Sequence, residues 1–175
     1  MSAKIQIGNF YVVATPIGNK ADITLRAIEK FKEVDLILCE DSRTTIPLLK
    51  DLGITTQAKT LHRSSDPNYF EWIYDGLRKG QSYCLVSDAG TPGLSDPGSN
   101  VVRFLRSKNI SCIPIPGASA LAAIVSISGF QANPTIFLGF LSEKKRKETV
   151  SARSIQANRW THCLLRICSQ NASID

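Results

Sequence analysis

Residues 86–98, with the sequence VSDAGTPGLSDPG, have the composition of a binding loop. They contain two aspartates, three glycines and two prolines in thirteen residues. Glycine permits positive φ and lets a ligand approach the backbone, whereas proline fixes φ and removes a hydrogen-bond donor. The loop is therefore expected to be bent and stiff, with the carboxylate of Asp88 near its centre. Such a loop suits a polar ligand that is held mainly through main-chain contacts.

A second group of reactive side chains occurs in residues 40–44, with the sequence EDSRT. Glu40 and Asp41 can accept a proton, and Arg43 can pair with a phosphate or a carboxylate. We predict that these three residues lie on the substrate side of a site. The alternative is an ion pair with Arg43 combined with capping of a helix. His62 is a further proton acceptor, for which the alternative is a packed or loop-facing histidine.

The sequence lacks the common nucleotide, hydrolase and metal motifs. We find no G-x-G-x-x-G, no G-x-x-x-x-G-K-[ST] and no G-x-S-x-G pattern. The five cysteines form no C-x-x-C pair, and the chain has only two histidines. We therefore predict no metal site, and we interpret the cysteines of the apolar runs as small buried thiols.

Apolar runs alternate with segments of helical periodicity, which predicts an α/β fold with a mostly parallel sheet flanked by helices. Asp22 is expected to cap the first helix, and Ser42 or Thr44 to open the second. The last helix is almost wholly small or apolar, so it is expected to be buried on several sides. Strands are expected at residues 10–15, 34–39, 60–62, 83–87, 111–115 and 135–140, and helices at 23–32, from 42 or 44 to 52, at 66–77, from 96–97 onward and at 119–128.

Four polar loops follow four of the predicted strands. The carboxyl ends of parallel strands meet at one edge of a sheet, and ligands of such folds bind there. These loops therefore converge on one crevice, which is the candidate site, unless each is only a tight turn. They comprise residues 15–19, 40–44, 87–96 and 116–119.

Length and composition predict one domain and the start of another. We expect an α/β domain over residues 1–130, the start of a second domain over 131–150 and an atypical tail over 151–175. No apolar run reaches the roughly 20 residues of a membrane span, and the N-terminus lacks a signal-peptide pattern, so we expect a cytoplasmic protein. The net charge is +6, but residues 1–140 carry 14 basic and 12 acidic side chains. The general electrostatic argument for nucleic-acid binding by the main domain is therefore weak.

Taken together, the loop sequences resemble the ribosomal RNA small-subunit methyltransferase I family, which belongs to the tetrapyrrole-methylase superfamily of S-adenosylmethionine (SAM) enzymes. The resemblance covers residues 10 to about 148. Its motifs, in chain order, are TPIGN at 15–19, DITLRA at 22–27, EDSR at 40–43, SDAGTP at 87–92, SDPG at 95–98, PGASA at 116–120 and GFL at 139–141.

The resemblance implies a usually dimeric two-domain enzyme that methylates the ribose 2′-hydroxyl of a cytidine in small-subunit rRNA. It also implies that SAM lies between the domains. The residues that the motifs assign to SAM are Pro16, Ser87, Asp88, Ala89, Gly90, Thr91, Ser119 and Ala120.

Two features depart from the family pattern. Arg63 follows His62, where the family has glutamate, and from Ser151 onward the chain no longer resembles the family's second domain. A truncated or frameshifted product is therefore expected, with weak SAM binding and little activity. Two alternatives stay open: a tetrapyrrole C-methylase with a small-molecule substrate, and an inactive remnant that only folds or dimerises.

Overall fold

A computed structural model of the chain describes residues 7–61, 67–93, 96, 98–129, 135 and 137. The chain divides into two compact units, Met1–Ser119 and Ala120–Asp175.

The first unit is built on a five-stranded sheet in which every neighbouring pair is parallel. The strand order is β3-β2-β4-β1-β5, so β4 lies between β2 and β1. Tyr11 of β1 is in register with Cys84 of β4 on one side and with Ile113 of β5 on the other. The parallel sheet expected from the continuous apolar runs is thus confirmed. The strands are β1 Phe10–Val13, β2 Leu36–Cys39, β3 Ala58–Thr60, β4 Tyr83–Val86 and β5 Cys112–Ile115.

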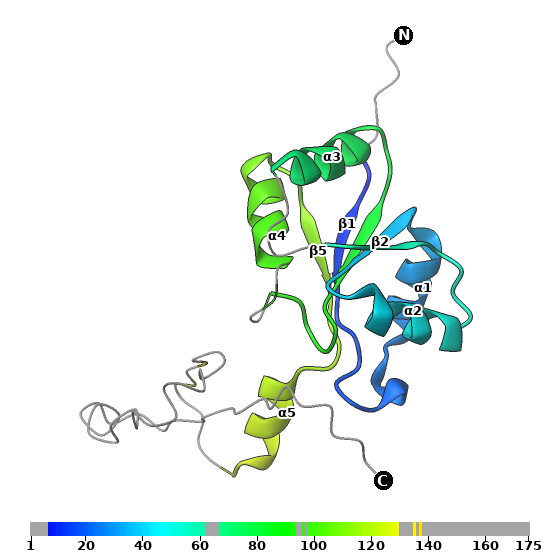
Figure 1. Cartoon of the computed structure of the whole chain (residues 1–175). Helices are drawn as coiled ribbons and strands as arrows, with labels where there is room; N and C mark the ends of the chain where they lie inside the picture. The colour runs from blue at the N-terminus through cyan, green and yellow to red at the C-terminus, as the bar shows by residue number, and fades with distance from the viewer. Residues whose placement is uncertain are drawn as a thin grey trace, which may run out of the picture. The chain divides into compact units, whose positions relative to one another are not determined.

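Helices cover both faces of this sheet (Figure 1). Helices α1 (Leu25–Glu33) and α2 (Ser42–Asp51) pack on one face, and α3 (Pro67–Arg78) and α4 (Gly98–Ser107) pack on the other. Alternate strand residues enter the two cores. The first core is formed with α1 and α2 by Val13, Ile37, Cys84 and Ile115, and the second with α3 and α4 by Phe10, Leu38, Tyr83 and Leu85.

The helix starts differ in detail from the sequence predictions. Thr24 caps α1, because its hydroxyl accepts a hydrogen bond from the backbone N–H of Ala27 at 3.1 Å. The expectation that Asp22 has this role was wrong, since Asp22 ends a short 3-10 helix, Lys20–Asp22, that precedes the cap. Asp41 caps α2, and Ser42 is the first helical residue. Short polar side chains all suit a cap, so the path of the chain decides which one is used.

In the second unit, α5 (Ala120–Ile127) is the one helix within the residues described. None of its residues is buried, and Ile127 is 84% exposed, so the expectation of burial on several sides was wrong. The strand expected over 135–140 lies outside the described residues except for Thr135 and Phe137. The predicted boundary at residue 130 and the tail over 151–175 also lie outside them, and both stay predictions.

Candidate functional site

The loops that follow β1 and β4 are joined by a two-bond backbone bridge. The N–H of Thr15 donates to the carbonyl of Gly90 at 2.9 Å, and the N–H of Gly90 donates back at 3.1 Å. The Thr15 hydroxyl adds a bond to the carbonyl of Ser87 at 3.1 Å. Thr15 is only 3% exposed, so these bonds are shielded from water. The motif reasoning did not single out Thr15, although a hydroxyl residue that ends an apolar strand is a usable signal.

Ser87 stabilises the bend of the loop after β4. Its side chain is buried, and its hydroxyl lies 3.3 Å from the carbonyl oxygen of Gly90 and 3.4 Å from that of Ala89. Gly90 has a φ of +78° and Gly93 a φ of +100°, which is the region that favours glycine. The Ser87 side chain therefore supports the loop.

The loop after β5 contacts the same two loops. The hydroxyl of Thr91 donates to the carbonyl of Ala118 at 3.2 Å. Gly117 lies so close to the end of β1 that a Cβ on it would stand 2.9 Å from the Cβ of Ala14. Glycine is required at residue 117 because any side chain there would displace the neighbouring strand end.

The loop after β2 joins the group through Asp88. One carboxylate oxygen of Asp88 accepts a hydrogen bond from the backbone N–H of Asp41 at 3.0 Å. Partial burial raises the pKa of the Asp88 carboxyl above its usual range, and the Asp41 N–H opposes that shift. Asp88 is nevertheless exposed, so the carboxylate can also accept hydrogen bonds from a ligand.

Asp41 and Arg43 form a closed local pair. The Asp41 carboxylate accepts from the Arg43 backbone N–H at 2.8 Å and from the guanidinium at 2.6 Å. These bonds to Arg43 hold the pKa of the Asp41 carboxyl below its usual range. Asp41 is therefore a weak proton acceptor, and the ion pair with helix capping that formed the alternative interpretation is present. Glu40 beside it is half-buried and is engaged in an interaction of its own.

All four loops thus meet at the carboxyl edge of the sheet, as the sequence predicted. Pro16 follows directly on the Thr15 bridge and is half-buried. Ser119 ends the first unit and Ala120 begins the second, so the two residues are considered apart. His62 lies outside the described residues. Among the residues described, no three His, Cys, Asp or Glu side chains form a metal-binding group. The part of the chain that the structure describes also has no helix long and apolar enough to cross a membrane.

Sequence comparison places the chain among known proteins. A ribosomal RNA small subunit methyltransferase I from Leptospira biflexa is 55% identical over 159 residues, which are 89% of this chain and 66% of the relative. The protein of the same name from Synechocystis is 46% identical over 80% of this chain and 50% of its own length. That from Mycoplasmopsis pulmonis is 38% identical over 86% of this chain and 68% of its own length. The chain therefore spans half to two thirds of these relatives.

Structure comparison agrees on the fold. A uroporphyrin-III-C-methyltransferase from Thermus thermophilus is 17% identical, with a TM-score of 0.54 over 69% of this chain and 53% of that protein. A putative cobalamin synthesis related protein from Corynebacterium diphtheriae is 14% identical, with a TM-score of 0.58 over 83% of this chain and 68% of that protein. Residues 9–170 match the family of tetrapyrrole (corrin/porphyrin) methylases. The chain belongs to this family and, within it, to the group of ribosomal RNA small subunit methyltransferase I.

Proposed function

We propose that this chain carries the cofactor loops of a SAM-dependent methyltransferase that modifies the ribose 2′-hydroxyl of a cytidine in small-subunit rRNA. The observation that carries the proposal is the convergence of four loops, joined by the Thr15–Gly90 bridge and the Asp88–Asp41 hydrogen bond. The relatives named above are 55% and 46% identical to this chain over the matched residues and are named as ribosomal RNA small subunit methyltransferase I.

The residues present fit SAM. The exposed carboxylate of Asp88 can accept hydrogen bonds from amino or ribose hydroxyl groups. Gly90 bears no side chain at a point where the nearest neighbouring atom, Cγ2 of Ile17, lies 3.2 Å from where a Cβ would stand. Glycine at residue 90 therefore allows the loop after β4 to pack against the loops after β1 and β5. The proposed contacts are those of Pro16, Ser87, Asp88, Ala89, Gly90, Thr91, Ser119 and Ala120.

SAM supplies a methyl group that is already activated on a sulfonium, so the protein has mainly to align it with an oxygen whose proton must leave. Asp88 is proposed to orient the cofactor, and the Thr15–Gly90 bridge holds the loop that carries Asp88. Glu40 is proposed as the proton acceptor on the substrate side, because Asp41 is held by Arg43 in a pair that weakens it as a base. Arg43 is 89% exposed and is proposed to contact a substrate phosphate while Asp41 holds both its backbone N–H and its guanidinium.

Transfer of labelled methyl groups tests the proposal directly. The purified chain is incubated with methyl-labelled SAM and small ribosomal subunits that lack the modification. Because weak SAM binding and little activity are expected of this chain, a small amount of label is expected at a cytidine ribose. It should disappear with Glu40→Gln while the weak calorimetric SAM binding persists. Absence of both SAM binding and transfer would refute the proposal. Label on a porphyrinoid substrate in place of rRNA would favour the tetrapyrrole C-methylase.

Asp88→Asn tests the cofactor contact, with Asp75→Asn as the matched control. Asp75 is an exposed carboxylate of α3, which packs with α4 on one face of the sheet. SAM affinity should fall only for the Asp88 variant, since a neutral amide accepts hydrogen bonds more weakly than a carboxylate. Equal affinities for the two variants would exclude the contact.

Two further properties belong to the proposal. A homodimer is expected, and light scattering on the purified chain checks it, because a monomer at micromolar concentration would exclude a stable dimer. Cytoplasmic localisation is proposed because the ribosomal substrate is found there, and cell fractionation with an antibody against the chain tests it.

A further inference from the structure

We propose that the groove between α4 and β5 binds the sugar-phosphate backbone of single-stranded RNA next to the cofactor loop. The inference rests on the proposed function, because it names the place where the substrate strand lies. The groove is lined by Val12, Leu85, Thr91, Pro92, Gly93, Ser99, Val102, Arg103, Arg106, Ile110, Ser111, Cys112 and Pro114. Its volume is about 920 Å³, near the upper end of the roughly 300–1,000 Å³ that is typical of ligand pockets.

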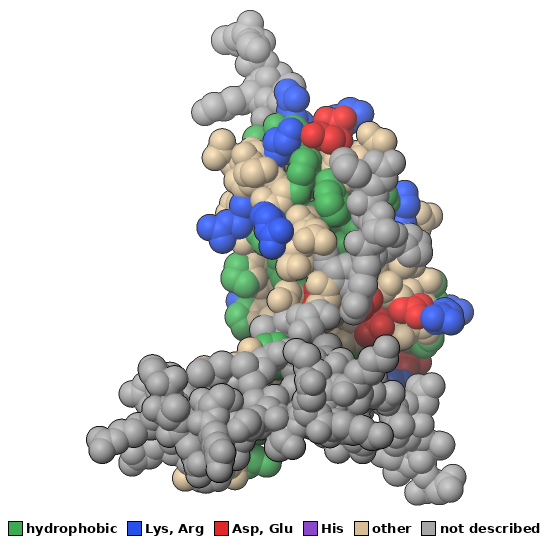
Figure 2. All heavy atoms as spheres, turned by 60° about the vertical axis from the view of Figure 1, so that its left-hand side comes forward, with side chains coloured by type: hydrophobic (Ala, Val, Ile, Leu, Met, Phe, Trp, Pro, Cys, Tyr) green, Lys and Arg blue, Asp and Glu red, His purple; other side chains and the backbone are tan. Residues whose placement is uncertain are grey.

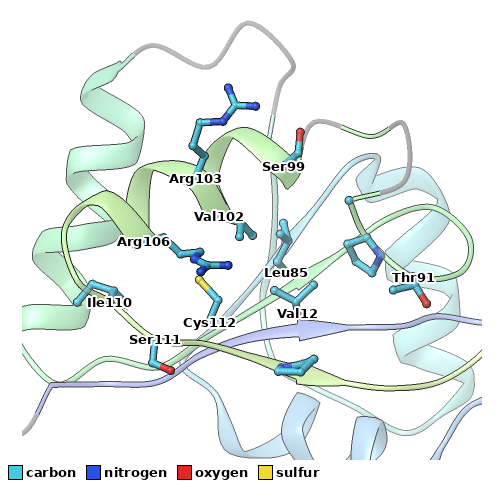
Figure 3. A pocket seen from close by; sticks show the side chains of 13 residues that line it. Val12, Leu85, Thr91, Ser99, Val102, Arg103, Arg106, Ile110, Ser111 and Cys112 are labelled. Carbon is cyan, nitrogen blue, oxygen red and sulfur yellow. The ribbon is translucent and has the colours of Figure 1, made fainter. Parts of the chain in front are cut away.

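The charged side of the groove comes from one face of α4. Ser99, Arg103 and Arg106 recur at helical spacing, while Val101 and Leu105 on the opposite side of the helix are buried in the core. Figure 3 shows Arg106 extending toward Cys112 across the groove, and Arg103 reaching outward from the neighbouring turn. The positive charge of Arg106 also acts to lower the pKa of the Cys112 thiol, against the larger effect of burial.

No acidic side chain lines the groove among the described residues. The sequence supports this local charge, because residues 97–142 contain Arg103, Arg106 and Lys108 but neither Asp nor Glu. Lys108 is paired with Glu71 of α3, so the charge of the groove comes from the two arginines. The charges of residues 1–140 nearly balance over their whole length, but the segment 97–142 is basic. Figure 2 turns this side of the molecule toward the viewer, and basic side chains are prominent on it. Exposed arginines without a neighbouring carboxylate are suited to phosphate groups.

The floor of the groove is apolar where the rim is basic. Val12, Leu85 and Val102 line it together with Cys112 and Pro114, and the hydroxyls of Ser99 and Ser111 are exposed at its edge. A single-stranded nucleotide has the same division, with a base whose faces are apolar and a charged, hydrogen-bonding backbone. A small inorganic anion would use the arginines but would leave the apolar floor unfilled.

The groove is continuous with the candidate site. Thr91, Pro92 and Gly93 form one of its walls, and they belong to the loop that also contains Asp88 and Gly90. The Thr91 hydroxyl is bonded to the carbonyl of Ala118 in the loop after β5. An RNA strand bound in the groove would therefore extend to the loop that is proposed to hold the methyl donor.

The test compares RNA binding by the full chain with that of an Arg103→Gln/Arg106→Gln double variant. Fluorescence anisotropy with a labelled 20-nucleotide single-stranded RNA is measured over a series of KCl concentrations. Loss of two phosphate contacts should lower the slope of log K against log salt by about 1.4 and weaken binding on the order of tenfold at 0.1 M salt. Arg103→Lys/Arg106→Lys retains the charge and should keep most of the salt slope.

A Lys32→Gln/Lys50→Gln variant is the matched control. Both lysines are exposed and lie in the last turns of α1 and α2, on the other face of the sheet, and the change in net charge is the same. The inference is overturned if the arginine variant and this control bind RNA alike, or if the arginine variant loses affinity at an unchanged salt slope. It is also overturned if the arginine variant changes the oligomeric mass rather than RNA binding, because the groove is then a protein interface.

SAM calorimetry and thermal melting of the same variants separate this inference from the proposed function. Both arginines are exposed and lie outside the Asp88–Asp41 contact, so SAM affinity and melting temperature should equal those of the unmodified chain. If the unmodified chain binds RNA but fails to bind SAM, the proposed cofactor is refuted and the proposed RNA groove still stands. Loss of the arginine effect with SAM binding intact refutes the groove alone.

Discussion

Replacement of Gly90 by alanine tests whether the backbone conformation of the loop after β4 is needed for ligand binding. Gly90 has a φ of +78°, and an L-residue in the left-handed region costs roughly 1–2 kcal/mol. The new Cβ would also lie 3.2 Å from Cγ2 of Ile17, but that side chain is 37% exposed and can move aside. The free energy of unfolding should therefore fall by about 1–2 kcal/mol, a roughly 5- to 30-fold change in the folding equilibrium.

Gly53→Ala is the matched control for backbone strain. Gly53 follows α2 with a φ of +66°, and nothing lies within 4 Å of a Cβ placed on it. Urea unfolding should give a similar loss of stability for the two variants. Calorimetry should give the SAM affinity of the unmodified chain for Gly53→Ala. For Gly90→Ala it should give about tenfold weaker affinity, the effect of about one hydrogen bond, because strain at Gly90 shifts the loop that carries Asp88.

Two outcomes would refute this reasoning. Unchanged SAM affinity in Gly90→Ala, with the expected loss of stability, would mean that ligand binding does not depend on the conformation of this loop. An unchanged free energy of unfolding for Gly53→Ala would mean that alanine is not strained in the left-handed conformation. The loss of stability expected for Gly90→Ala would then have no basis.

Three other predictions each concern a single side chain. Thr15→Val leaves the buried carbonyl of Ser87 without its hydroxyl donor and should cost about 1–3 kcal/mol in urea unfolding; Thr15→Ser keeps the donor and should restore the bond. The pKa of Asp41 is lowered by Arg43, so its contribution to stability is complete above its usual pKa of 3.8 and is lost as the pH falls through the lowered value. Unfolding curves between about pH 2 and pH 6 should therefore show the gap between the unmodified chain and Asp41→Asn closing toward acid. Burial raises the pKa of the Cys84 thiol to about 12, so peptide mapping after iodoacetamide treatment near pH 8 should find Cys84 modified only in the unfolded chain.

The order of strands and helices follows from local sequence because buried parallel strands are continuous apolar runs. For example, the apolar run that ends in Val86 identifies a buried strand without reference to any other part of the chain. Details that depend on distant parts of the chain do not follow in this way. Thr24 and Asp22 are both suitable caps, and the preceding 3-10 helix makes Thr24 the one that is used. Helix α5 is a second example. Its apolar sequence predicted burial, but none of its residues is buried.

The strand order explains why the site forms from residues far apart in sequence. Because β4 lies between β2 and β1, the loop after it is flanked by the loops of both neighbours. Asp88 therefore reaches the N–H of Asp41 on one side, and Gly90 pairs with Thr15 on the other. A strand inserted at the sheet edge would bring its loop against only one neighbour. The same position aligns the outer part of this loop, at Thr91, with the groove beside β5, so that one loop borders both the proposed cofactor site and the proposed RNA groove.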